Sequence, residues 1–253
     1  MNASQPARGP NRRRLGWLAL AALVIAALAP IALHAIEDPA EDELMAFLRG
    51  DEDGSTDAER RAHIDRAIEL APGRARYREV RALFRFDHHD FDGAQRDLDR
   101  AIEIEDRPYS RYLRALTFCE RSDPERALAD LDAAIDVQPD DVQFRIARAL
   151  ARVATNAAAE ALLDADRAVS GGPQSGQSHF ARGVALSALG RDAEALAAFD
   201  DAVGRRADLV HAWRARAECH ERLADPAAAR ADRDEADRRA SGAFPASLDP
   251  FHY

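Results

Sequence analysis

The chain has 253 residues, of which 47% are hydrophobic and only 6% are aromatic, and its 45 acidic residues outnumber its 35 basic residues. A chain of this length and composition can bury a sizeable core, in one domain or in one continuous array of repeats. The formal net charge of −10 argues against a nucleic-acid-binding protein, because phosphate contacts require a basic face. Abundant alanine and few β-branched residues favour closely packed helices over sheets.

Residues 15–36 form an uncharged apolar segment that follows a basic N-terminus, residues 1–14. A helix over residues 15–33 would be about 28 Å long, close to the thickness of the hydrocarbon core of a membrane. Because the basic flank stays in the cytoplasm, we expect an uncleaved signal-anchor helix in the inner (cell) membrane, with the rest of the chain on the extracytoplasmic (periplasmic) side. The alternative is a signal peptide cleaved near Ala35, which would release a secreted or periplasmic soluble protein.

Small residues recur through most of the remaining chain at intervals of 33 or 34 residues. The three phased series are Ala82, Ala115, Ala149, Gly183 and Ala217; Ala94, Ala127, Ala161, Ala195 and Ala229; and Ala67, Ala101, Ala134, Ala168, Ala202 and Ala236. Such a period is typical of an array in which each repeat buries its apolar faces only against its neighbours. Small side chains at fixed positions let the helices approach closely.

This pattern resembles the tetratricopeptide repeat, a 34-residue helix–turn–helix unit with small residues at these three positions. The resemblance implies an all-α fold, a right-handed α-solenoid preceded by one transmembrane helix. The array would span residues 58–240, with a degenerate half unit at 58–74 and full units at 75–107, 108–141, 142–175, 176–209 and 210–240. We expect residues 37–57 to be an extended acidic linker that contains the short first helix of the degenerate repeat, and residues 241–253 to be a non-helical tail.

The turns within these units carry helix-capping signals. Thr56 to Glu59 forms the pattern of a capping box, which opens a helix. Asp123-Pro124 and Asp225-Pro226 each place an acid at the N-cap and a proline at the first helical position. Gly190 is suited to close a first helix.

Arginines and aspartates follow the same period. The arginines are Arg81, Arg114, Arg148, Arg182 and Arg216, and the residues sixteen positions later are Asp97, Asp130, Asp164, Ala198 and Asp232. Positions so spaced lie at one level of an antiparallel helix pair, so we expect an Arg–Asp bridge inside four of the five units, as in a bacterial repeat variant with Arg-Gly or Arg-Ala in its first helix. Arg182 would be unpaired and available to a ligand carboxylate. The alternative is that both series project into solvent.

By the same resemblance, the first helices would line a concave groove. The candidate partner-binding residues are Tyr109, Tyr112, Leu116, Ile146, Leu150, Phe180, Arg182 and Val184. An apolar patch of this kind, rimmed by polar groups, is typical of a partner-binding site. The basic clamp with which chaperone-binding relatives hold a peptide carboxylate is absent, so we expect a protein or peptide partner with hydrophobic anchors. The alternative is that neighbouring helices, or the tail, cover these residues.

Motifs for catalysis or cofactor binding are absent. The sequence has no GxGxxG, P-loop, HExxH or nucleophile elbow. His88, His89, Asp90 and Asp92 fall at an expected turn, where polar residues are usual, so we expect no bound metal. Cys119 and Cys219 lie three repeats apart, too far for a disulfide.

We therefore expect no catalytic residues and no cofactor, and interpret the chain as a non-enzymatic, membrane-anchored scaffold for protein–protein interaction. Two alternatives remain. One is a regulatory or accessory subunit of a membrane enzyme complex, and the other is a secreted small-molecule or lipid-binding protein released by signal cleavage.

Overall fold

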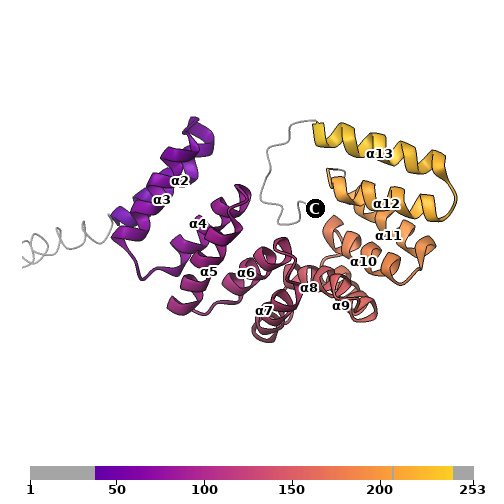
Figure 1. The fold of residues 1–253 in the computed structure, drawn as a ribbon, viewed down its shortest axis with the longest axis horizontal. Helices are drawn as coiled ribbons and strands as arrows, with labels where there is room; N and C mark the ends of the chain where they lie inside the picture. Colours follow the sequence, from indigo (N-terminus) through magenta and orange to yellow (C-terminus); the bar gives the residue numbers. More distant parts are fainter. Residues whose placement is uncertain (1–37, 207, 242–253) are drawn as a thin grey trace, which may run out of the picture. The chain divides into compact units, whose positions relative to one another are not determined.

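The computed structural model describes residues 38–206 and 208–241, which form twelve α-helices and no strand (Figure 1). The helices are α2 Pro39–Asp53, α3 Asp57–Leu70, α4 Ala75–Asp87, α5 Phe91–Ile104, α6 Pro108–Glu120, α7 Pro124–Val137, α8 Val142–Ala154, α9 Ala158–Gly171, α10 Gly176–Ala188, α11 Asp192–Arg205, α12 Val210–Arg222 and α13 Pro226–Ser241. They form two compact units, of which the first ends at Pro72 and the second begins at Gly73.

None of these described helices is long and apolar enough to cross a membrane. The expected transmembrane helix, residues 15–36, lies outside the described residues, and so do residues 242–253 of the expected tail. Ser241 is the last residue of α13.

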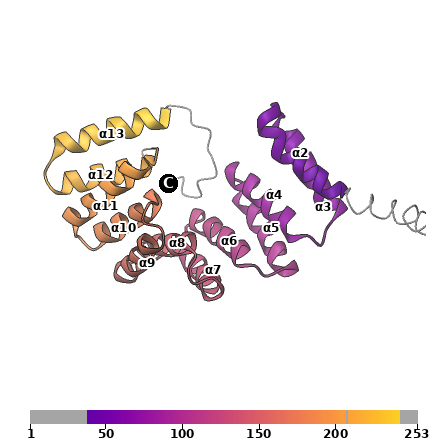
Figure 2. The ribbon, with the colours of Figure 1, turned by 180° about the vertical axis from the view of Figure 1, so that it is seen from behind.

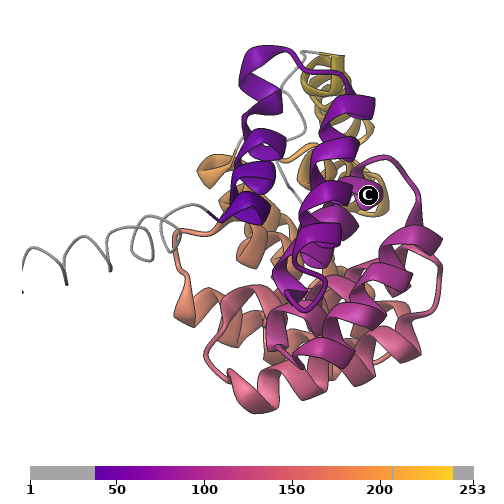
Figure 3. The same cartoon turned by 90° about the vertical axis from the view of Figure 1, so that its left-hand side faces the viewer.

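The first unit is an antiparallel pair of helices, α2 and α3, which lie side by side in Figure 3. The degenerate repeat has a first helix, as expected, but the helix is not short: residues 39–53 form four turns where an extended acidic linker was expected. Asp38 caps this helix by accepting a hydrogen bond from the Ala40 amide at 3.1 Å, and acids in the first turn suit the helix dipole. Leu44 and Phe47 are buried, so apolar packing outweighs repulsion among the acids.

The capping box of the first unit is confirmed. The Glu59 amide donates to Thr56 Oγ1 at 3.3 Å, while the Thr56 amide donates to Glu59 Oε2 at 2.8 Å. Two backbone donors at the start of α3 are thereby satisfied.

The second unit stacks five antiparallel helix pairs, α4/α5, α6/α7, α8/α9, α10/α11 and α12/α13, which can be followed in order in Figures 1 and 2. Their first helices begin at the first residues of the five expected repeats, Ala75, Pro108, Val142, Gly176 and Val210. Each first helix also contacts the first helix of the next repeat, whereas the second helices α5, α7, α9 and α11 pack against the first helices on either side of them. The first helices therefore form the inner face of the stack.

The small residues of the three series are buried at these helix contacts, as expected. Gly183 shows how close the contact is, because a Cβ atom there would lie 2.5 Å from Cε1 of Phe199. The other four repeats have alanine at the position of Gly183. In the first two of them, the position of Phe199 holds Leu98 and Leu131. The larger ring of Phe199 thus requires the loss of one methyl group on the facing helix.

Tight turns join the helices of each pair. Asp123 and Asp225 cap α7 and α13 by accepting hydrogen bonds from the amides of Arg126 at 3.3 Å and Ala228 at 3.0 Å, which confirms both expected caps. Gly190 has a φ of +72°, a left-handed conformation that glycine adopts without strain, and it ends α10 as expected.

Candidate partner-binding groove

Two hollows open on the face formed by the first helices of the second unit. The first, of about 330 Å³, is lined by Ala82, Leu83, Phe86, Asp87, Leu98, Tyr109, Tyr112, Leu113, Leu116, Thr117, Gln143, Gln177 and Arg206. The second, of about 510 Å³, is lined by Leu116, Cys119, Glu120, Ser122, Pro124, Ala147, Leu150, Ala151, Ala154, Phe180 and Val184. Leu116 belongs to both hollows, so they adjoin on α6.

Six of the eight residues expected to bind a partner line these hollows. Tyr109, Tyr112 and Leu116 line the first hollow, and Leu116, Leu150, Phe180 and Val184 line the second. Their exposure differs, since Tyr109 is 46% exposed whereas Tyr112 is only 5% exposed. The ring of Tyr112 lies 5.2 Å from that of Phe144, centroid to centroid, and forms part of the core. Tyr109 is therefore the better placed of the two tyrosines to contact a ligand.

Ile146 does not line either hollow, and its assignment to the groove is wrong. Its side chain is fully buried and packs with alanines of α8, α9 and α10. The residues of α8 that do line the second hollow are Ala147, Leu150, Ala151 and Ala154. These follow the i, i+3, i+4, i+7 spacing of one helix face, whereas Ile146 lies on the adjacent face, against the neighbouring helices.

Glu79 lies near the first hollow and is held in a closed network. Its carboxylate accepts hydrogen bonds from the Arg107 guanidinium and from the Ser110 hydroxyl, and the side chain is buried. Burial, together with the charge of Glu79, raises the pKa of the nearby Tyr109 phenol. The Tyr109 phenol therefore stays neutral and contributes aromatic surface to the first hollow. The Glu79 carboxylate is already paired with Arg107 and Ser110.

Glu120 is a residue of the second hollow that the sequence analysis missed. It is the only charged side chain among the lining residues, and its Oε1 atom is buried with no hydrogen-bond partner among the described residues. Burial raises the pKa of this carboxyl to about 7, because the ionised form loses hydration. Its position four residues after Leu116, on the groove face of α6, was the available sequence signal.

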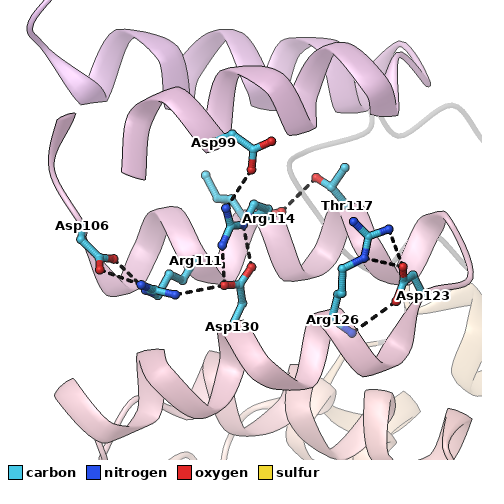
Figure 4. Close-up of polar contacts among 9 residues, drawn as sticks. Asp99, Asp106, Arg111, Arg114, Thr117, Asp123, Arg126 and Asp130 are labelled. Carbon is cyan, nitrogen blue, oxygen red and sulfur yellow. Dashed lines mark hydrogen bonds and ion pairs between the residues drawn. The ribbon is translucent and has the colours of Figure 1, made fainter. Parts of the chain in front are cut away.

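The predicted Arg–Asp bridges are confirmed within four of the five repeats. Arg114 Nε donates to Asp130 Oδ2 at 2.7 Å, as Figure 4 shows, and Arg148 Nε donates to Asp164 Oδ2 at 2.7 Å. The equivalent bonds from Arg81 to Asp97 and from Arg216 to Asp232 measure 2.8 and 2.9 Å. The four aspartates are buried, so these bonds lie between the packed helices rather than in solvent.

The arginines also reach the preceding repeat, which the sequence analysis did not foresee. Arg114 Nη1 donates to Asp99 Oδ1 at 2.7 Å, from α6 to α5 (Figure 4). The hydrogen bond to Asp130 and, secondarily, that to Asp99 raise the pKa of Arg114, which stays charged. The corresponding acids of the following repeats are Asp132 for Arg148, Asp166 for Arg182 and Asp200 for Arg216. One side chain thus joins three helices of two repeats.

Arg182 is not unpaired, and that expectation is wrong. Its Nε donates to Asp166 Oδ1 of the preceding repeat at 2.8 Å. The alanine at position 198 removes only the partner within the repeat. Arg182 lines neither hollow, so its assignment to the partner-binding residues has no geometric support.

His88 and His89 line neither hollow, Cys119 lines the second hollow, and Cys219 is buried in the core. His89 occupies a left-handed turn position with φ of 58°, and His88 Nδ1 lies 2.7 Å from the Phe84 carbonyl oxygen. Within residues 38–206 and 208–241, no three His, Cys, Asp or Glu side chains come together to hold a metal ion. Cys119 and Cys219 are both free thiols, and burial raises the pKa of Cys119 to about 11.

No protein-family model and no curated protein sequence matches the chain. Solved structures do match it. One is a tetratricopeptide repeat protein from Parabacteroides merdae (TM-score 0.65, 14% identity, 79% of each chain covered). A second is TTC0263, a tetratricopeptide repeat protein of Thermus thermophilus (TM-score 0.62, 20% identity, 70% of this chain and 94% of that chain). A third is YrrB, described as a tetratricopeptide repeat protein with an unusual peptide-binding site (TM-score 0.50, 17% identity, 70% of this chain and 91% of that chain).

At these identities the likeness concerns the fold alone. It agrees with the repeat period and with the stack of helix pairs. The described part of the chain is an all-α helical-repeat solenoid like those of tetratricopeptide repeat proteins.

Proposed function

We propose that the chain is a non-enzymatic scaffold that binds a segment of a partner polypeptide along the inner face of its repeats. The observation that carries this proposal is the pair of adjoining apolar hollows on that face. Apolar concave sites of several hundred Å³ with a few polar groups are typical of ligand-binding surfaces. YrrB, which shares the fold, is described as having a peptide-binding site, and a peptide ligand agrees with the proposal.

The acidic side chains support a binding role rather than a catalytic one. Asp97, Asp130, Asp164 and Asp232 are each hydrogen-bonded to an arginine in repeat register, which commits them to helix packing. A general acid or base needs a carboxyl that faces the reacting group. These four carboxylates instead face the adjoining helix.

The proposal includes attachment to the inner (cell) membrane through residues 15–36, with the repeats on the extracytoplasmic side. Two features support this. The segment is uncharged and long enough to cross a membrane, and it is preceded by basic residues and followed by acidic ones. Carbonate extraction of membranes and N-terminal sequencing of the mature chain test it together. An anchored protein stays in the membrane fraction with residues 1–14 intact, whereas a new N-terminus near Ala35 would show a cleaved signal.

Site-specific photo-crosslinking in intact cells tests the groove. A photoreactive phenylalanine analogue replaces Tyr109 on the inner face or, as a matched control, Leu163 on α9, which is also well exposed. The inner position is expected to yield discrete adducts whose partner peptide is then identified by mass spectrometry. Equal adducts from both positions, or adducts from Leu163 alone, would place the binding surface elsewhere.

A further inference from the structure

The second hollow combines an apolar lining with one carboxyl group whose buried oxygen has no hydrogen-bond partner among the described residues. Leu150, Phe180 and Val184 provide apolar surface from α8 and α10, and Glu120 enters from the end of α6. The buried Oε1 atom of Glu120 accepts no hydrogen bond from any described residue. A carboxylate in such surroundings is costly, because its charge loses hydration without a compensating donor.

The arginines around the hollow do not supply that donor. On α6, Arg111 pairs with Asp106 and Arg114 pairs with Asp130. On α8, three arginines share Asp164, namely Arg145, Arg148 and Arg152. On α10, Arg182 pairs with Asp166. The titratable neighbour on α6 is the Cys119 thiol, which is neutral below about pH 9 because burial raises its pKa to about 11. Arg121, which follows Glu120 in the chain, pairs with Asp92, and Arg126 on α7 pairs with Asp123. A cation carried by a ligand would supply the charge that these described residues do not.

Resting on the partner-binding function proposed above, we propose that the second hollow selects a partner segment with a lysine or arginine beside an apolar anchor. The anchor packs against Leu150, Phe180 and Val184, and the cation donates hydrogen bonds to the Glu120 carboxylate. Charge-assisted bonds of this kind are among the strongest in proteins when water is excluded. The aliphatic stem of a basic side chain also packs on apolar surface, so both parts of the ligand fit one hollow.

Neutral, acidic and purely apolar ligands fit this arrangement less well. A neutral anchor would cover Glu120 without supplying charge, and an acidic side chain would be repelled by it. In the unliganded hollow, burial raises the pKa of the Glu120 carboxyl to about 7. A bound cation favours the ionised form, so it lowers that pKa and releases a proton on binding.

The test begins with random peptides displayed on phage and selected on the full-length chain in a non-ionic detergent. A parallel selection uses Ala154→Trp, which fills the second hollow from its exposed rim. Peptides that bind the wild type but not Ala154→Trp are expected to carry Lys or Arg next to Leu, Phe or Trp. One such peptide with lysine is then synthesised together with its norleucine counterpart, which keeps the stem and removes the charge.

Fluorescence polarisation measures both peptides on wild type, Glu120→Gln and Glu125→Gln, the last an exposed control on α7. The lysine peptide is expected to bind Glu120→Gln about tenfold more weakly or worse, and Glu125→Gln unchanged. The norleucine peptide is expected to bind Glu120→Gln at least as tightly as the wild type, and Glu125→Gln with the wild-type affinity.

Two outcomes would overturn the ideas separately. Hollow-dependent peptides without basic residues, unaffected by Glu120→Gln, would contradict the cation site and leave the groove function standing. Binding in the second hollow itself, and hence the proposed function there, would be contradicted in either of two cases. In the first, no peptide is selected. In the second, every selected peptide binds Ala154→Trp as tightly as the wild type.

Discussion

Arg148 Nη2 donates a hydrogen bond to Asp164 Oδ1 over 2.7 Å, and the Asp164 side chain is only 1% exposed. The same guanidinium donates through Nη1 to Asp132 of the preceding repeat over 2.8 Å. Because Asp132, Arg148 and Asp164 belong to α7, α8 and α9, one arginine fixes both the pairing within a repeat and the stacking between repeats. The arrangement recurs with the repeat period, apart from the missing acid at Ala198.

Arg148→Ala should destabilise the chain clearly more than Arg182→Ala. The first removes the bidentate partner of the buried Asp164 and leaves it the hydrogen bond from Arg152 Nη1 and a longer contact with Arg145. Breaking a buried pair costs at most about 3–5 kcal/mol, and the remaining arginines reduce that loss. The second removes one bond to the half-exposed Asp166, for which about 0–1 kcal/mol is expected. Urea denaturation followed by circular dichroism measures both losses, and equal losses would contradict the structural role of the buried pair.

Ala198→Asp should depend on Arg182. With the arginine present, the new carboxylate has the partner that the other repeats provide, and the free energy of unfolding should change by less than about 1 kcal/mol. In an Arg182→Ala background the same aspartate has no cation opposite it, at a position that is fully buried, and should cost about 3–5 kcal/mol. A double-mutant cycle gives the coupling energy. Additive effects would show that positions 182 and 198 do not face each other.

Gly183→Ala should destabilise by about 1–3 kcal/mol, because the added methyl group meets the Phe199 ring. Combining it with Phe199→Leu, the residue found at the equivalent position in the first two repeats, should recover most of the loss due to Gly183→Ala. Thermal or urea unfolding of the two single variants and the double variant measures this. A loss that persists unchanged in the double variant would mean that backbone flexibility, not crowding, selects glycine.

Glu120 should make stability fall as pH rises from about 5 to about 7. Its pKa in the folded chain is raised by burial from an ordinary 4.5 to about 7, so the folded state binds more protons than the unfolded state across that range. The free energy of unfolding should drop by about 1–2 kcal/mol, reduced by solvent screening of the partly exposed side chain. Glu120→Gln should remove this contribution, which urea titrations at several pH values measure. Glu125→Gln serves as the control and should leave the pH profile unchanged.

Much of the fold could be predicted because the same contact recurs in each repeat. The buried series of alanines and the sixteen-residue spacing from arginine to aspartate repeat at 33 or 34 residues, so each unit supports the interpretation of the others. The bridges to the preceding repeat carried a similar signal, since Asp99, Asp132, Asp166 and Asp200 follow the same period. Each of these bridges joins two repeats, so the pattern within a single unit does not reveal it.

Non-repeating features were harder to predict. The helix α2 lies outside the regular repeats, so no equivalent residues elsewhere in the chain indicate where it begins and ends. Its many acidic residues are typical of a linker, and only the structure shows that Leu44 and Phe47 are buried. Glu120 is likewise one carboxyl in a chain of 45 acidic residues. Its place on the groove face of α6 can be read from the sequence. Its burial cannot, because burial depends on how neighbouring helices pack around the hollow.

The sequence by itself determined the repeat period, the helix pairs and the arginine–aspartate bridges, because these depend on local spacing that recurs along the chain. Only the tertiary structure decided which side chains line the hollows. Ile146 and Ala147 are neighbours on α8, yet Ile146 packs wholly between helices and Ala147 lines the second hollow. The physical reason is that adjacent residues on a helix point about 100° apart, and the way successive repeats pack determines which direction remains open.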